Sequence, residues 1–322
     1  MPAKPVDKIS INSIFGCKGK GFCMKNISRR EFLARAALSA GLGALSLQFL
    51  SACDKKKAYP LGVCDWTLGG AGNPKALELS KQAGLDGTQI SSAKEKPEGE
   101  FFTKEQLAAY KKAMQETGMK IASTSPTCMN SNPFYSAKGA VEFTCSAIDA
   151  AAELGSNCIL LPFYGPANMQ NPDKTMNEKC FAPLVSRLKE VAAYAQKKNV
   201  MVSMENSVSA KDNLRIIDAV GSDWVNVYFD IFNFQYYGHD TLDSLKALKG
   251  HIGQMHLKDS KHKLDSNSGL PRKMDECLRT IETIGYEGWL VFELHGFNRK
   301  KDGEEIDTIR HNAQFIRKFY AQ

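Results

Sequence analysis

The chain has 322 residues, of which 43% are hydrophobic and 24% are charged. These fractions are typical of globular proteins and exclude collagen-like, disordered and multi-span membrane classes. The formal net charge of +7 is concentrated at the N-terminus, because residues 1–52 hold eight Lys and Arg against two acidic residues. The nearly neutral remainder lacks the basic face with which proteins neutralise phosphates, so we expect no nucleic acid as partner.

Residues 1–52 are ordered like a bacterial export signal. Arg29 and Arg30 belong to an S-R-R-x-F-L sequence, an apolar stretch follows over 36–50, and L-S-A-C ends at Cys53. The paired arginines resemble a twin-arginine signal, and the tetrapeptide resembles a lipobox. The apolar stretch is shorter than the ~20 residues of a permanent membrane helix. We interpret 1–52 as a signal region, with Met24 as an alternative start; an amphipathic first helix is the competing interpretation.

In this interpretation Cys53 becomes a lipidated N-terminus and residues 53–58 form a short tether. The protein is then exported folded and lies in the cell envelope of a bacterium, as a periplasmic or membrane-anchored lipoprotein that touches the membrane only through Cys53. Six further cysteines follow, none in a C-x-x-C pair. We expect them to be mostly buried free thiols, with no zinc ribbon.

From residue 59 onward, short apolar or β-branched segments alternate with longer segments of helical period. The predicted strands are Leu61–Trp66, Asp86–Ser91, Met119–Thr124, Asn157–Phe163, Val200–Glu205, Val225–Asp230, Ile252–Lys258 and Trp289–Leu294. Eight βα units in ~250 residues predict a single α/β domain, a (β/α)8 TIM barrel over 59–322. A doubly wound open sheet is the alternative, but no G-x-G-x-x-G follows the first strand.

Four consecutive predicted strands end in residue types that ligate metals. Their apolar segments lead to Glu205, Asp230, His256 and Glu293. In a closed barrel these positions meet at one rim, and a carboxylate at the end of an apolar strand is costly unless it is paired or bound to a cation. Each residue alone is a capped strand end or an ion-paired carboxylate, but together they predict one divalent-cation site. Three oxygen donors and one imidazole suit Mn, Mg or Co.

The motifs around these residues resemble the sugar phosphate isomerase/epimerase family of the xylose isomerase-like TIM barrels. They are E-N at Glu205–Asn206, D-x-x-N at Asp230–Asn233, H-x-K-D at His256–Asp259 and G-Y-x-G-W-x-x-x-E at Gly285–Glu293. The resemblance implies that the four predicted ligands hold one cation, manganese first, with Mg, Co or Zn as alternatives. It also implies that Glu205 and Glu293 act as catalytic acid and base.

Six residues are predicted to bind substrate. Asn233 stands where many relatives have His, and Gln89 where the second strand often ends in Glu; amides bind hydroxyls but do not shuttle protons near neutral pH. Lys258 and His295 follow two predicted ligands by two positions and therefore face the same interior side, although an ion pair with a rim carboxylate is equally compatible with Lys258. Trp66 and Phe163 are the predicted apolar walls, with a core position as the alternative.

These features predict a divalent-metal-dependent sugar isomerase or epimerase that abstracts an α-proton from a keto-sugar through an enediolate. An exported protein meets few sugar phosphates, so an unphosphorylated substrate is favoured. The alternatives are a metal-dependent lyase or hydrolase on oxidised glycosides and a barrel that only binds carbohydrate. The sequence leaves the oligomeric state open.

The export interpretation predicts the result of a fractionation experiment. Replacing both Arg29 and Arg30 with Lys should move the protein from the envelope to the cytoplasm, because the export machinery recognises the arginine pair. Cys53→Ala should abolish partition into detergent. An unchanged envelope fraction in the first variant contradicts the twin-arginine assignment, and unchanged partition in the second contradicts lipidation.

Overall fold

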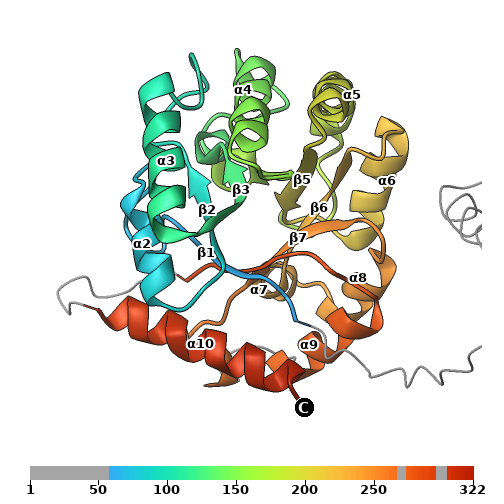
Figure 1. Ribbon diagram of the computed structural model, residues 1–322. Helices are drawn as coiled ribbons and strands as arrows, with labels where there is room; N and C mark the ends of the chain where they lie inside the picture. The colour runs from blue at the N-terminus through green and yellow to red at the C-terminus, as the bar shows by residue number, and fades with distance from the viewer. Residues whose placement is uncertain (1–57, 267–272, 295–302) are drawn as a thin grey trace, which may run out of the picture. The chain divides into compact units, whose positions relative to one another are not determined.

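Eight parallel strands close on themselves in chain order, and the last pairs with the first (Figure 1). The structure is a computed structural model that describes residues 58–266, 273–294 and 303–322. The strands are β1 (Leu61–Cys64), β2 (Gly87–Ser91), β3 (Lys120–Ser125), β4 (Cys158–Phe163), β5 (Met201–Asn206), β6 (Val225–Asp230), β7 (Ile252–Leu257) and β8 (Leu290–Phe292). The predicted TIM barrel is confirmed, and every strand end lies within two residues of its prediction. The export signal, Cys53 and His295 lie outside the described residues and stay predictions.

Helices surround the barrel on the outside (Figure 1). They are α2 (Lys75–Gln82), α3 (Lys104–Thr117), α4 (Ala140–Glu153), α5 (Glu178–Lys198), α6 (Ala210–Val220), α7 (Ile231–Tyr236), α8 (Thr241–Ala247), α9 (Met274–Thr283) and α10 (Glu304–Tyr320), with 3-10 turns η1 (Thr127–Asn130), η2 (Gly165–Ala167) and η3 (Leu264–Ser266). Local signals set their ends. A capping box of Thr103 and Gln106 begins α3, and Gly118, in the left-handed region at φ 74°, ends it.

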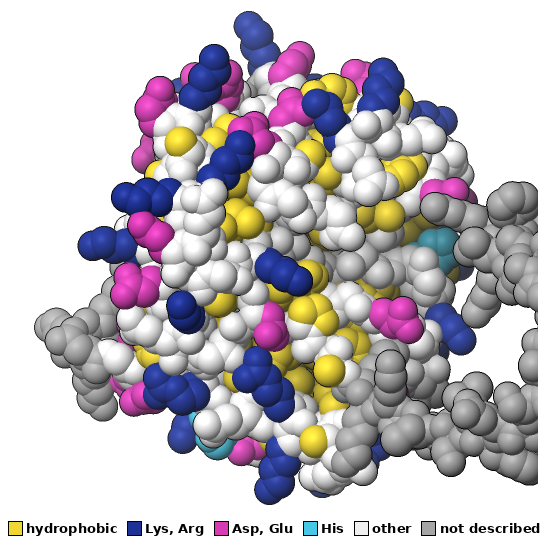
Figure 2. All heavy atoms as spheres, viewed as in Figure 1, with side chains coloured by type: hydrophobic (Ala, Val, Ile, Leu, Met, Phe, Trp, Pro, Cys, Tyr) yellow, Lys and Arg dark blue, Asp and Glu magenta, His cyan; other side chains and the backbone are white. Residues whose placement is uncertain are grey.

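The helices expose a mixed charged surface. Figure 2 shows Lys and Arg side chains interspersed with Asp and Glu over the visible face. Within the part of the chain that the structure describes, no helix has the length and apolar character needed to cross a membrane. The six described cysteines are free thiols, and all but Cys145 are buried, as predicted.

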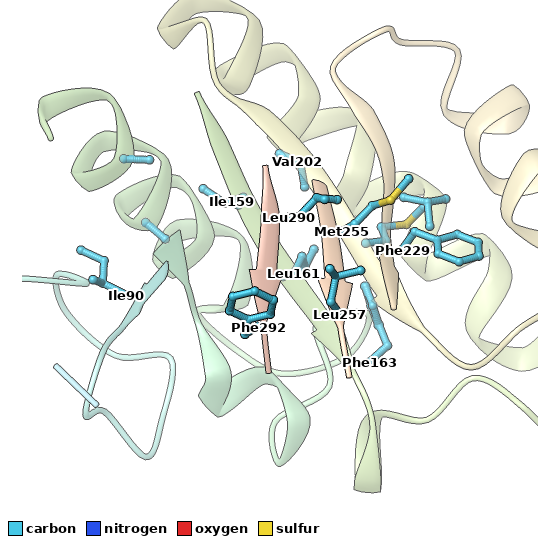
Figure 3. Packing of buried hydrophobic residues seen from close by; sticks show 14 of the residues in the cluster. Ile90, Ile159, Leu161, Phe163, Val202, Phe229, Met255, Leu257, Leu290 and Phe292 are labelled. Carbon is cyan, nitrogen blue, oxygen red and sulfur yellow. The ribbon is translucent and has the colours of Figure 1, made fainter. Parts of the chain in front are cut away.

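The main apolar core lies between the strands and the helices. Figure 3 shows Ile159, Leu161 and Phe163 of β4 and Phe292 of β8 within it. Each of these side chains is excluded from water, and burying one such side chain contributes roughly 1.5–3 kcal/mol to folding. Because strand side chains alternate, the residues between them face the barrel interior.

The barrel interior beneath the rim contains a group of polar side chains beside a small apolar cluster of Cys64, Ala122 and Val291. Gln89, Ser123, Ser203 and Gln254 are all buried there, where branched apolar residues usually dominate this fold. Gly253 makes room for them, because a Cβ at this position would lie 2.3 Å from Ser203 Oγ. The four polar side chains hydrogen-bond to one another or to neighbours in the barrel, which offsets the cost of their burial.

Candidate active site

A cavity of about 470 Å³ opens at the carboxyl ends of the strands. Its wall is formed by residues at or just beyond the carboxyl ends of the strands. They include Trp66 after β1, Ser91 and Ser125 at the ends of β2 and β3, Tyr164 after β4, Glu205 of β5, Asn233 in α7, Tyr237 after α7, Lys258 after β7 and Glu293 after β8. Active sites of TIM barrels lie at this face, because the strand-to-helix loops converge there. The cavity is therefore the candidate active site.

A second cavity, of about 500 Å³, lies at the opposite end of the barrel. Tyr59, Trp289 and Tyr320 line it, together with Arg317 and Asp86, whose side chains lie 3.4 Å apart. Trp289 therefore lies far from the rim that carries Glu293. This cavity contains no cluster of metal-ligating side chains among the described residues, and it does not compete as the catalytic site.

Glu205, Asp230, His256 and Glu293 converge at the rim, as predicted. Ligand atoms of all four lie within 4.8 Å of one another. His256 Nδ1 lies 3.1 Å from Glu205 Oε1, 3.6 Å from Glu293 Oε2 and 3.8 Å from Asp230 Oδ2. All four side chains are buried. They meet because β6 and β7 pair Asp230 directly with His256, and because β5 pairs with β6 and β7 pairs with β8.

The donor set fits a divalent cation. Asp230 Oδ2 is buried and has no hydrogen-bond partner within the described part of the chain, although such groups in proteins are nearly always satisfied. Burial raises the pKa of Asp230 to about 7; Lys258 opposes this rise, whereas Glu205 and Glu293 add to it. Three carboxylates facing one lysine leave an excess of negative charge, and a divalent cation between them would neutralise it and occupy the free oxygen.

Lys258 and Trp66 hold Glu293 from two sides. Lys258 Nζ lies 2.9 Å from Glu293 Oε2 and 3.8 Å from Asp230 Oδ2, and Trp66 Nε1 donates a hydrogen bond of 3.0 Å to Glu293 Oε1. Burial alone would lower the pKa of Lys258, but the surrounding carboxylates raise it above its ordinary value. The lysine is therefore a fixed positive charge at the cavity wall. It faces the interior, as predicted, and it also forms the ion pair with a rim carboxylate that the sequence analysis gave as the alternative.

Asn233 links the opposite carboxylate, Glu205, to the hydroxyl of Tyr164. Asn233 Nδ2 donates to Glu205 Oε1 at 3.3 Å and to the Tyr164 hydroxyl at 3.0 Å, and its backbone N–H donates to Asp230 Oδ1 at 2.8 Å. Asn233 lines the cavity, and its role in substrate binding stays a prediction. Tyr164 also lines the cavity. It follows a predicted strand, but the sequence does not show whether an aromatic residue at a strand end lines the cavity or packs in the core.

Two predicted substrate contacts are wrong in place. Phe163 faces the helices, where its ring meets Phe134 edge-on at 6.3 Å, and it does not line the cavity; its neighbours Pro162 and Tyr164 do. Gln89 faces inward, but it lies beneath the rim and its Oε1 is 2.7 Å from His256 Nε2. Gln89 therefore contacts a predicted metal ligand and does not line the cavity.

Ser125 is a wall residue that the sequence analysis missed. Its hydroxyl is buried at the cavity wall and has no hydrogen-bond partner among the described residues. A substrate hydroxyl would satisfy it. The S-T-S-P sequence at the end of β3 carried no pattern that separates such a serine from an ordinary turn residue.

Comparison with known proteins places the chain in a family. Residues 77–319 match the family model described as the xylose isomerase-like TIM barrel. The chain belongs to this family. The match spans seven of the eight strands and all four rim residues.

Individual relatives are more distant. L-ribulose-5-phosphate 3-epimerase UlaE of Salmonella heidelberg is 27% identical over 272 residues, which cover 79% of this chain and 90% of the relative. Among solved structures, D-psicose 3-epimerase from Clostridium cellulolyticum H10 with D-tagatose has a TM-score of 0.66 at 16% identity, covering 81% of this chain and 99% of that one. The 3-keto-D-glucoside 4-epimerase YcjR from E. coli has a TM-score of 0.65 at 14% identity, covering 81% and 100%. These structural similarities show the shared fold.

The raised pKa of Asp230 predicts how cation binding depends on pH. A carboxyl group whose pKa is higher folded than unfolded stabilises the protein at low pH, and this contribution is lost as the pH rises through ~4 to ~7. A bound cation requires the ionised carboxylate, so Mn²⁺ should raise the melting temperature more at about pH 8 than at about pH 6. Differential scanning fluorimetry with and without Mn²⁺ measures this difference.

Asp230→Asn is the matched control for this measurement. Its amide does not titrate, so the Mn²⁺-dependent rise should be smaller than in the parent and less dependent on pH. An equal rise at both pH values in the parent protein contradicts the assignment of Asp230 as a ligand.

Proposed function

We propose that the protein is a divalent-cation-dependent sugar isomerase or epimerase. The observation that carries the proposal is the buried convergence of Glu205, Asp230, His256 and Glu293 at the catalytic rim of the barrel. The family, and relatives that are named as sugar epimerases, support the reaction class. A cation held by these four residues would supply Lewis-acid polarisation of a substrate carbonyl.

The two glutamates are the proposed acid and base. Glu205 and Glu293 both reach the cavity, from β5 and from the end of β8, with β6 and β7 between them. One carboxylate removes the proton α to the carbonyl and the other returns a proton to the resulting enediolate, which inverts the carbon or shifts the carbonyl. Acid/base help of this kind contributes typically ~10²–10⁴-fold.

The neighbours of each glutamate give it a defined orientation. Trp66 and Lys258 hold one Glu293 oxygen each, and Asn233 binds Glu205. Lys258 is not a base, because its pKa is raised and it stays protonated. It instead donates a hydrogen bond, and when substrate binds it stabilises negative charge on a substrate oxygen.

Substitution of the glutamates tests the mechanism. Glu205→Gln and Glu293→Gln should each lower turnover of a responsive ketose by about 10²-fold or more even at saturating Mn²⁺, since an amide is no base near neutral pH. Asp230→Asn should weaken Mn²⁺ binding but recover part of its activity at high Mn²⁺. The measurement is exchange of the α-proton in deuterated water, followed by NMR.

The same spectra separate the competing functions. Full exchange in both glutamine variants contradicts the two-glutamate mechanism. Release of an aglycone from a keto-glycoside without inversion would replace the isomerase by the lyase alternative. Binding of sugar without any exchange in the Mn²⁺-saturated parent protein would replace it by the carbohydrate-binding alternative.

The cavity charge favours an unphosphorylated substrate. Among the described residues of its wall, Lys258 is the one cationic side chain, and Glu293 already neutralises it at 2.9 Å. A phosphate group needs donors or positive charge that are not already paired. The proposal therefore departs from the phosphorylated substrate in the name of the UlaE relative.

Paired substrates test this preference. A free 2-ketopentose or 2-ketohexose should be converted with a kcat/KM at least about tenfold higher than its terminal phosphate, which corresponds to ~1.4 kcal/mol of transition-state stabilisation. Steady-state assays of each pair on the Mn²⁺-loaded protein measure the ratio. A preference for the phosphate contradicts the proposed substrate class.

A further inference from the structure

A continuous chain of buried hydrogen bonds crosses the barrel beneath the cavity and ends on His256. It runs from the backbone carbonyl of Ala122 through Gln254, Ser123 and Gln89. The successive distances are 2.8 Å from Gln254 Nε2 to Ala122 O, 2.7 Å from Ser123 Oγ to Gln254 Oε1, 2.8 Å from Gln89 Nε2 to Ser123 Oγ, and 2.7 Å between Gln89 Oε1 and His256 Nε2. All of these side chains are shielded from solvent.

The backbone carbonyl determines the direction of every bond in this chain. A carbonyl only accepts, so Gln254 must place its NH₂ group toward Ala122 and its Oε1 toward Ser123. The Tyr228 hydroxyl donates to the same Oε1 at 3.0 Å, which agrees with this orientation. Ser123 has a single hydroxyl proton and gives it to Gln254, so toward Gln89 it can only accept.

The direction is passed on to the imidazole. Gln89 must place its NH₂ group toward Ser123, which leaves Oε1 facing His256 Nε2. The Cys64 thiol also donates to this oxygen, at 3.1 Å, and its sulfur lies 3.3 Å from His256 Nε2, where it can accept. An oxygen that only accepts requires a proton on Nε2, and in a neutral imidazole the lone pair then lies on Nδ1. Nδ1 is the nitrogen that faces the three carboxylates.

We propose that Gln254, Ser123 and Gln89 are positioning residues that select the Nε2–H tautomer of His256 and so present Nδ1 as the cation ligand. The inference rests on the proposed function, because it assumes that the rim holds a cation. It assigns a role to the polar interior of the barrel. A fully satisfied buried network is rigid, and residues that orient metal-ligating histidines typically contribute 10–100-fold to metal affinity.

Gln89→Leu and Ser123→Ala are the test variants. Gln89→Leu removes the acceptor that faces Nε2, and Ser123→Ala frees the Gln89 amide to turn. Zn²⁺ is a suitable probe because it is diamagnetic. ¹⁵N NMR of histidine-labelled, Zn²⁺-loaded protein distinguishes a protonated from a metal-bound ring nitrogen, with the His256 signals assigned by comparison with His256→Asn. Calorimetry gives the Zn²⁺ dissociation constant.

We expect the parent protein to show a proton on Nε2 and Zn²⁺ on Nδ1 of His256. Both variants should lose this single pattern and bind Zn²⁺ about 10–100-fold more weakly. Gln89→Glu keeps an acceptor oxygen toward Nε2, so it should retain the Nε2–H signal. A role limited to packing would not separate Gln89→Glu from Gln89→Leu in this signal.

Ser203→Ala is the matched control. Ser203 is also a buried serine of the barrel interior, but it hydrogen-bonds to Asn226 at 2.7 Å and lies outside the chain to His256. Its loss should leave the His256 signals and the Zn²⁺ affinity unchanged. A loss equal to that of Ser123→Ala would mean that general disturbance of the interior is responsible, and it would overturn the inference.

Two results separate this inference from the proposed function. If the parent protein binds Zn²⁺ at the rim but Gln89→Leu and Ser123→Ala keep both the tautomer and the affinity, the positioning role is wrong and the cation site stands. If the parent protein binds no Zn²⁺, the cation site and the positioning role both fail.

Discussion

Burial of like charge at the rim is the constraint on which the rest of the structure depends. Glu205, Asp230 and Glu293 lie close together and shielded from water, an arrangement that is strongly unfavourable for ionised carboxylates without positive charge between them. Lys258 supplies one such charge from the wall. The proposed cation supplies the remaining positive charge, with the neutral imidazole of His256 as a further ligand. Binding of the cation should therefore also stabilise the folded rim.

The polar barrel interior is the counterpart of this rim. If branched apolar residues filled the interior, Nε2 of His256 would lose the hydrogen bond to Gln89. The chain from Ala122 O through Gln254, Ser123 and Gln89 meets that requirement, and each side-chain nitrogen and oxygen in it has at least one hydrogen-bond partner. The larger apolar core accordingly lies outside the strands, where the helices pack, and a smaller apolar cluster contains Cys64, Ala122 and Val291.

Side chains alternate along each strand between the helix-facing core and the barrel interior, and this alternation also divides residues that stabilise the fold from residues that form the site. On each strand, one set of side chains packs against helices and the other faces the barrel axis. Substitutions on the first set act on folding, whereas those on the second act on the site. Lys258, Asn233 and Trp66 come from positions beyond the strand ends, in or beside loops, and these positions are where members of one fold family differ in substrate.

The sequence by itself determined the barrel and the convergence of its four rim residues. Eight βα units allow few other closed architectures, and residues at the ends of consecutive parallel strands must meet at one edge. It did not determine which face Phe163 takes, because β4 is apolar at nearly every position and strands buried on both sides show no alternation. Nor did the sequence determine how far below the rim of the barrel the Gln89 side chain lies. Strands in a barrel are tilted and staggered, and the register of β2 shifts beside Gln89. Only the closed tertiary structure therefore decided that this amide contacts His256 and does not line the cavity.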